Sequence, residues 1–245
     1  MPPAPGTTKR RRWRLILAGA ACVAAGMATG LIFGNPFSDP VNPLEPFIAK
    51  MMNGTALETT LAEFFRIAAE RGDPDAQFEL AWRYAEGSGV ATNREEAVNW
   101  YRKAAEQGHI IAQIRLGNCY QQGKGIPRDL HEAAKCYLQA ANQDDPEGQW
   151  RLGACYLVGK GLTRNAVEAV RWFQLAVEQE DADAQLLLGI CYWGGLGVAV
   201  DRDQAISLFF KSADQGNEQA KAVIFKMGEG ILPEFPFDEP SSDDA

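Results

Sequence analysis

The chain has 245 residues, an apolar content of 46% and a formal net charge of −8. Basic residues before position 15 contribute +5, so the rest of the chain carries −13. A body this acidic repels phosphate backbones, which makes nucleic acid a poor partner. The apolar content is sufficient for a buried core and excludes a wholly disordered chain.

The first predicted element is a membrane-spanning helix over residues 15–34, a 20-residue run without a charged side chain. That length crosses a hydrocarbon core of ~30 Å. The basic segment 1–14 precedes it, so the positive-inside rule places the N-terminus in the cytoplasm and the following domain in the periplasm or an equivalent lumen. The alternative is a signal peptide cleaved near Ala28-Thr29-Gly30, which would leave a secreted protein.

Three glycines within this helix, Gly26, Gly30 and Gly34, are spaced four residues apart. This spacing lets two membrane helices approach closely and suggests self-association through the anchor. The alternative is that small residues are simply common in this segment.

Two segments are predicted to lack regular structure. Residues 35–56 contain four prolines, which favour an extended linker between the membrane and the folded domain. Residues 229–245 are acidic and proline-containing, which is typical of a disordered tail. The folded domain is therefore expected over residues 57–228.

From Asp73 to Gly216 the sequence repeats every 36 residues, four times and without an insertion. Each unit has leucine at its eighth position, alanine or glycine at its ninth, tyrosine at its twelfth, and then a pair of glycines. The tyrosines are Tyr84, Tyr120, Tyr156 and Tyr192. Such a period is typical of a stacked solenoid, in which each unit buries its apolar face against its neighbours.

Each unit is predicted to form two helices. In the first unit Asp73 can cap a helix start, and Gly87 can end that helix with a positive φ. The second helix of every unit begins with the pattern of a capping box, in which two free amides are satisfied reciprocally. The capping positions are Asn93, Asp129, Asn165 and Asp201, each followed three residues later by Glu or Gln.

The pattern continues beyond the four units. Glu58–Gly72 matches a lone second helix, and Asn217–Gly228 matches a lone first helix. Solenoids need such terminal units to cover the ends of the stack. Ten helices are therefore predicted.

These residues resemble the Sel-one-like repeat (SLR), a relative of the tetratricopeptide repeat. In the second unit the matching residues are Ala112, Leu116, Gly117, Tyr120, Gly123, Gly125 and Ile126; in the first they are Ala97, Trp100, Tyr101, Lys103, Ala104, Ala105 and Gly108. The resemblance covers residues 57–228. It implies an all-α, right-handed α/α superhelical solenoid of four full repeats with half-repeat caps, whose concave groove holds peptides or partner proteins in membrane-associated assemblies.

No catalytic residue, metal site or cofactor is predicted. The chain has no Gly-x-Ser-x-Gly elbow, phosphate loop or dinucleotide fingerprint, and His109 and His131 have no partner at metal-ligand spacing. Cys119, Cys155 and Cys191 share one position in successive units and are expected, with Cys136, to be buried thiols. The alternative is a disulfide from Cys136 to Cys119 or Cys155.

The resemblance also implies an alternative function. Some secreted, cysteine-rich relatives are described as β-lactamases, so the chain could be an exported envelope hydrolase acting on a peptidoglycan-like substrate. Penicillin-binding folds use a Ser-x-x-Lys nucleophile for that chemistry, and the chain contains no such motif.

If the first helix of each unit lines the concave side, as the resemblance implies, three positions per unit face the groove. The predicted groove residues are Phe78, Trp82, Ile114, Asn118, Gln121, Trp150, Leu157, Leu186, Ile190 and Trp193. An exposed apolar ladder of this kind would bind an amphipathic helix or an extended peptide. The alternative is that these side chains pack between repeats. The sequence thus predicts a membrane-anchored scaffold for an unknown protein or peptide partner.

Overall fold

The structure is a computed structural model that describes residues 54–229 and 231. These residues belong to one compact unit and form ten α-helices with no strand among them. The predicted membrane helix at 15–34, the glycines within it, most of the linker and nearly all of the tail lie outside the described residues. None of the ten described helices is both long enough and apolar enough to cross a membrane.

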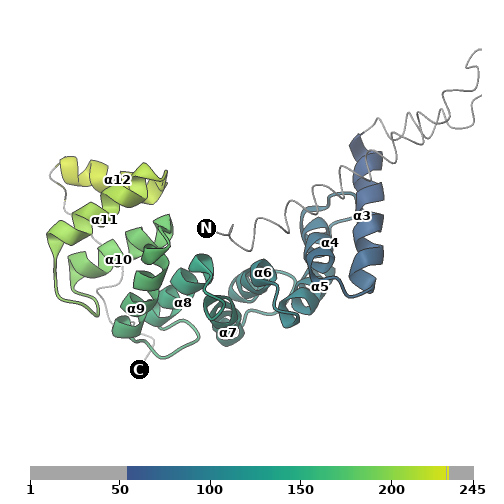
Figure 1. Cartoon of the computed structure of the whole chain (residues 1–245), viewed down its shortest axis with the longest axis horizontal. Coiled ribbons are helices and arrows are strands. Elements are labelled where there is room, and N and C mark those ends of the chain that lie inside the picture. The colour runs from purple at the N-terminus through teal and green to yellow at the C-terminus, as the bar shows by residue number, and fades with distance from the viewer. Residues whose placement is uncertain (1–53, 230, 232–245) are drawn as a thin grey trace, which may run out of the picture. The chain divides into compact units, whose positions relative to one another are not determined.

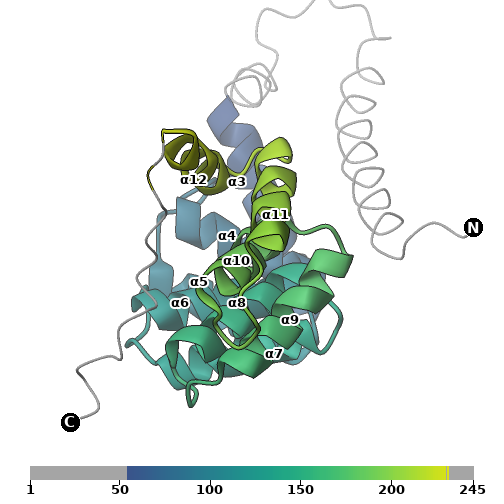
Figure 2. The ribbon, with the colours of Figure 1, turned by 90° about the vertical axis from the view of Figure 1, so that its left-hand side faces the viewer.

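The helices alternate between two kinds, named here A for the first helix of a repeat and B for the second. The A helices are α4 (Pro74–Glu86), α6 (Ile110–Gln122), α8 (Pro146–Val158), α10 (Ala182–Gly194) and α12 (Glu218–Gly228). The B helices are α3 (Gly54–Glu70), α5 (Arg94–Glu106), α7 (Leu130–Ala141), α9 (Ala166–Glu178) and α11 (Arg202–Asp214). Each helix packs against the next in sequence, and α8 also touches α10 (Figure 1, Figure 2). The predicted row of four hairpins with a half-repeat at each end is confirmed.

Helix starts and ends follow the predicted capping chemistry. The Asp73 carboxylate accepts a hydrogen bond from the Ala76 amide at 2.9 Å, and Asn93 does the same for Glu96 at 3.1 Å. Gly87 closes α4 with a φ of 78°. His109 caps α6 through Nδ1, which lies 3.1 Å from the Ala112 nitrogen. Four of the five A helices are thus capped by Asp or Asn and one by an imidazole.

The reciprocal half of the predicted capping box is not made. The backbone N–H of Asn93 donates to the carbonyl oxygen of Tyr84 at 2.8 Å, so it is no longer available to the Glu96 side chain. The same bond joins Asp129 to Tyr120, Asn165 to Tyr156 and Asp201 to Tyr192. The end of each A helix therefore holds the start of its own B helix through the backbone.

Helix α3 begins at Gly54, earlier than the predicted start at Glu58. Its position equivalent to the capping Asn or Asp of other B helices is occupied by Leu57, which has no side-chain acceptor. Because nothing ends the helix there, it extends into residues that the sequence assigned to the linker.

Adjacent repeats interlock where their turns meet the preceding B helix. The second glycine of each pair has a positive φ and no room for a side chain: a Cβ on Gly161 would lie 2.0 Å from the carbonyl oxygen of Leu130. Gly89, Gly125 and Gly197 are equally blocked, by Glu58, Arg94 and Ala166. Glycine here serves a close approach between repeats as well as a turn.

A row of paired glutamines joins the two helices of each full repeat, at the helix ends opposite the turn glycines. Gln107 donates from Nε2 to Oε1 of the buried Gln77 at 2.7 Å, and Gln77 donates in turn to the carbonyl oxygen of Ala69 in the preceding B helix at 3.1 Å. The same side-chain pair recurs as Gln143–Gln113, Gln179–Gln149 and Gln215–Gln185. This row was not predicted from the sequence, although both positions hold glutamine in all four units.

Candidate functional site

The predicted groove residues divide into buried and exposed groups. Four of the ten are almost inaccessible to solvent: Ile114, Leu157, Leu186 and Ile190, exposed by 6% or less. The expectation of a continuous exposed ladder on the A helices is therefore wrong. These four side chains pack in the core, so the alternative interpretation, in which the predicted groove residues are packed rather than exposed, applies to them.

The reason lies in the small residue at the ninth position of each full repeat. There the backbone lies against an aromatic ring of its own B helix, and a Cβ on Gly189 would lie 2.7 Å from Cε1 of Phe209. The side chains that flank this glycine close around the same ring. Leu186 and Ile190 share a core cluster with Phe209, and Leu157 shares one with Phe173.

The two polar residues of the predicted ladder also have an internal role. The hydroxyl of the buried Tyr137 lies 2.7 Å from Oδ1 of Asn118 and 2.8 Å from Oε1 of Gln121. Repeats three and four place Phe173 and Phe209 where repeat two has Tyr137, and surround these rings with apolar side chains. Asn118 and Gln121 thus provide amide oxygens that can accept the hydrogen bond of the phenol in their own hairpin.

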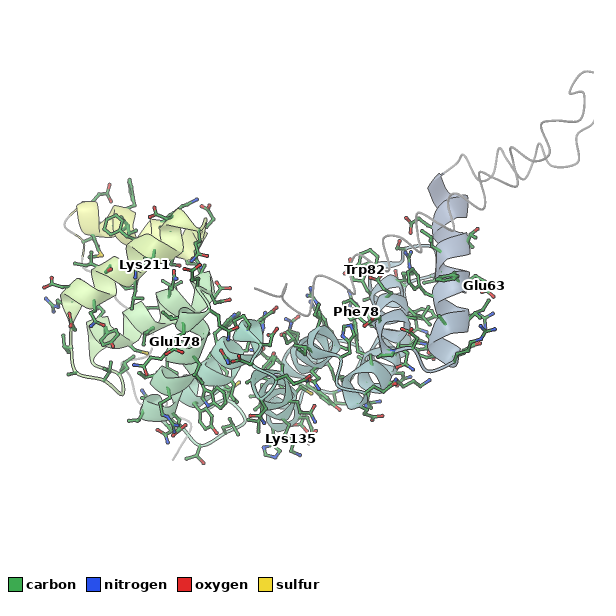
Figure 3. All side chains as sticks on the ribbon, viewed as in Figure 1. Glu63, Phe78, Trp82, Lys135, Glu178 and Lys211 are labelled. Atoms are coloured by element: carbon green, nitrogen blue, oxygen red, sulfur yellow. The ribbon has the colours of Figure 1, made fainter. Side chains whose placement is uncertain are left out.

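Four aromatic residues of the predicted set retain exposed surface, and we call them the aromatic row: Phe78, Trp82, Trp150 and Trp193. Trp82 is 39% exposed, and the other three are half-buried. Phe78 and Trp82 lie on the same side of α4 (Figure 3). The row occupies three of the four repeats.

Cations lie over the three indoles of the aromatic row. The guanidinium carbon of Arg83 is 5.9 Å from the Trp82 ring centroid, that of Arg151 is 4.4 Å from Trp150, and that of Arg202 is 5.1 Å from Trp193. Cation–π attraction of this kind holds aromatic side chains in place.

The first repeat contributes two of the four side chains of the aromatic row, Phe78 and Trp82. Phe78 stacks on the His109 ring with centroids 4.8 Å apart, and it also contacts Tyr101 at 5.8 Å. His109 Nε2 lies 3.5 Å from the Asp75 carboxylate. Burial raises the pKa of the nearby Glu79 carboxyl above its usual value. This end of the row combines two aromatic side chains with carboxylates.

The environment of Arg83 was not predicted from the sequence. This residue occupies the position of Cys119, Cys155 and Cys191 in the other repeats, and it is 6% exposed. Its guanidinium bonds Glu58 at 2.7 Å and stacks 5.0 Å from the Phe65 centroid. The only signal in the sequence was that the first repeat has arginine where the other three repeats have cysteine. It fastens α3 to the first full repeat.

A cavity of about 370 Å³ opens beside α3 rather than along the aromatic row. Its lining includes Thr59, Glu63 and Arg66 of α3 and Leu80 and Tyr84 of α4. Arg66 already bonds Glu63 and Glu70 on the same helix. None of the polar residues in the lining is buried.

The chemistry of the described residues does not favour catalysis. All four cysteines between residues 54 and 229 are free thiols, so the alternative disulfide at Cys136 does not form. Burial raises the pKa of Cys136 and Cys191 to about 12, the opposite of an activated nucleophile. No cluster of metal-ligating side chains occurs within the same residues.

Comparison with known proteins identifies the repeat. The model of the Sel1 repeat matches residues 74–109, 110–145, 146–181 and 182–217, more than half of the chain. The chain belongs to the Sel1 repeat family. The resemblance found in the sequence is thereby confirmed, and Sel1 repeats generally act as protein-interaction scaffolds.

Two solved structures are similar to this Sel1 repeat domain. A Sel1 repeat protein from Oxalobacter formigenes is 36% identical, with a TM-score of 0.63, covering 66% of this chain and 67% of that one. A protective antigen of uropathogenic Escherichia coli strains with an SLR fold is 35% identical, with a TM-score of 0.64; the match covers 69% of this chain but only 37% of the antigen. None of the curated proteins matches the sequence.

Proposed function

We propose that this chain is a membrane-anchored scaffold whose Sel1 repeat domain binds a partner protein through the aromatic row. The observation that carries the proposal is the combination of four uninterrupted Sel1 repeats with partly exposed aromatic side chains on their A helices. Buried tryptophan and arginine side chains dominate the binding energy of most protein interfaces. The Trp150–Arg151 and Trp193–Arg202 pairs supply both residue types, whereas Arg83 beside Trp82 is buried.

The rigidity of the domain supports this proposal. The glutamine pairs join B helices to A helices on one side, and the turn glycines join the repeats on the other. A surface that does not reorganise on binding loses little conformational entropy. Because little entropy is lost, few contacts with the aromatic row are needed to bind a partner.

The chemistry around the first repeat indicates the kind of partner. Phe78 and Trp82 offer apolar surface on α4, the helix that also carries the carboxylates of Asp75, Glu79 and Glu86. Like charges at an interface oppose association, whereas complementary potentials favour it. We expect the partner segment to present apolar anchors flanked by lysine or arginine.

The anchor belongs to the same proposal. Residues 15–34 would span the membrane with the basic segment in the cytoplasm, which places the repeats in the periplasm or an equivalent lumen. A reporter enzyme that is active only after export, fused behind residue 245, tests this orientation. Activity in membranes is expected, and an inactive fusion would contradict it.

A matched pair of variants tests the binding surface. The full chain is crosslinked in membranes and its partner is identified by mass spectrometry, after which affinities are measured with purified proteins. Trp82→Ala is expected to weaken binding at least tenfold, because the variant removes an aromatic anchor. Leu175→Ala serves as the control, because Leu175 on α9 is 41% exposed, close to the 39% of Trp82. Equal effects of the two variants, with helicity retained, would refute the proposed surface.

A further inference from the structure

The second repeat differs from the others in the residue that caps its A helix. The other four A helices are capped by a carboxylate or an amide, at Asp73, Asp145, Asp181 and Asn217. Helix α6 is capped by the imidazole of His109, whose Nδ1 lies 3.1 Å from the Ala112 nitrogen. Nδ1 accepts this N–H through its lone pair, so the cap requires a ring with no proton on Nδ1.

The same ring also reaches the preceding repeat. Nε2 of His109 lies 3.5 Å from Oδ1 of Asp75 on α4. The neutral ring with its proton on Nε2 therefore serves both helices, with Nδ1 toward α6 and Nε2 toward α4. Phe78 stacks on the face of this ring, with centroids 4.8 Å apart and planes inclined by 16°. His109 thus joins repeats one and two at the Phe78 end of the aromatic row.

The last A helix makes the same two contacts with an amide. Oδ1 of Asn217 accepts the Ala220 N–H at 3.0 Å, and its Nδ2 donates to Oδ1 of Asp183 at 2.8 Å. Asp183 occupies the position of Asp75 in its own repeat. An amide keeps one acceptor and one donor at any pH, whereas an imidazole loses its acceptor when it is protonated. His109 therefore adds a proton dependence to a pair of contacts that asparagine makes without one.

Charges on the neighbouring helices act on this ring in both directions. The charged residues on the parts of α4, α5 and α6 nearest His109 in their repeats are Asp75, Glu79, Lys103, Glu106 and Arg115. Residues 136–141 of α7 carry no charge. The Asp75 carboxylate faces Nε2 and stabilises an imidazolium, whereas the Ala112 N–H and the positive end of the α6 dipole oppose one. Protonation therefore keeps the contact to Asp75 and removes the cap.

We propose that His109 is a pH-sensitive switch between repeats one and two. At neutral pH its ring caps α6 and contacts Asp75. An imidazole takes up a proton below about pH 6.5, and here that proton goes to Nδ1, where it faces the Ala112 N–H. The first turn of α6 then frays beside Phe78 while the ion pair to Asp75 is kept. The effect on binding through Phe78 rests on the function proposed above, whereas the switch is a property of the chain without a partner.

Hydrogen exchange at the Ala112 amide tests the switch. Solvent-exchange NMR of the full chain without a partner is recorded between about pH 8 and about pH 5, which spans the titration of an imidazole. Rates are converted to protection factors, which removes the intrinsic effect of pH on exchange. The protection of Ala112 is expected to fall about fivefold in acid, the ratio that a cap of ordinary strength supplies. The Ala220 amide, capped by Asn217, is the internal control and should keep its protection.

Two variants make the result specific. His109→Asn introduces the side chain that makes both contacts at α12, so the protection of Ala112 should no longer depend on pH. Asp75→Asn removes the charge that favours the imidazolium, so the loss of protection should move to lower pH. Constant protection of Ala112 in the unsubstituted chain, a parallel loss at Ala220, an equal loss in His109→Asn, or an unshifted midpoint in Asp75→Asn would each overturn the proposal.

Discussion

The contact between a turn and the preceding repeat can be measured by adding one methyl group. Gly161→Ala places a Cβ 2.0 Å from the carbonyl oxygen of Leu130 and 2.8 Å from the nitrogen of His131, both backbone atoms at the start of α7. The φ of Gly161 is +75°, which alone costs an L-residue ~1–2 kcal/mol. Displacing the turn adds about 1–3 kcal/mol, as for other overpacked sites. The expected total is roughly 2–5 kcal/mol.

Gly216→Ala is the matched control. Gly216 has a φ of +95°, but a Cβ built there meets nothing within 4 Å. Only the conformational cost of ~1–2 kcal/mol is expected for this variant. Urea unfolding of the full chain, followed by far-ultraviolet circular dichroism, compares the two. Equal losses of stability would refute the claim that the turns lock successive repeats together.

Three further predictions concern single side chains. Because burial raises the pKa of Cys136 and Cys191 to about 12, both thiols should resist iodoacetamide at mildly alkaline pH until the chain is unfolded; rapid labelling of the native protein would contradict their burial. Burial also raises the pKa of the Asp181 carboxyl in the folded state. As the pH falls, the folded state therefore binds this proton before the unfolded state does, and the free energy of unfolding rises. Asp181→Asn should therefore melt at the same or a higher temperature at neutral pH, and lose that advantage in acid; a lower melting temperature at neutral pH would contradict this. Tyr137→Phe should cost ~1 kcal/mol in denaturant unfolding, because the single O–H that faces the amide oxygens of Asn118 and Gln121 is lost, and an unchanged midpoint would contradict a stabilising hydrogen bond there.

The sequence predicted the helices well because their ends are encoded locally. A capping side chain such as Asn93 and a terminal glycine such as Gly87 act within a few residues of their own position. The exact start of α3 was missed because Leu57 provides no stop signal. The number and order of the helices followed from the period alone.

The candidate site was predicted less well because exposure depends on the partner helix. Periodicity assigned Leu186 and Ile190 to one stripe of their helix, but their burial is decided by the Phe209 ring of the next helix. The sequence placed Asn118 in the apolar ladder as a polar residue without a role, although its Oδ1 lies at hydrogen-bond distance from the Tyr137 hydroxyl. Pairings between helices of one repeat are not encoded in the spacing of either helix.

Oxidative footprinting of the tryptophans tests the central claim most directly. Trp82, Trp150 and Trp193 lie on A helices, whereas Trp100 and Trp172 lie on B helices. Saturating the full chain with its crosslinked and identified partner should lower the oxidation of the three A-helix tryptophans and leave the two on B helices unchanged. Uniform protection of all five, or protection confined to the B helices, would contradict binding through the aromatic row.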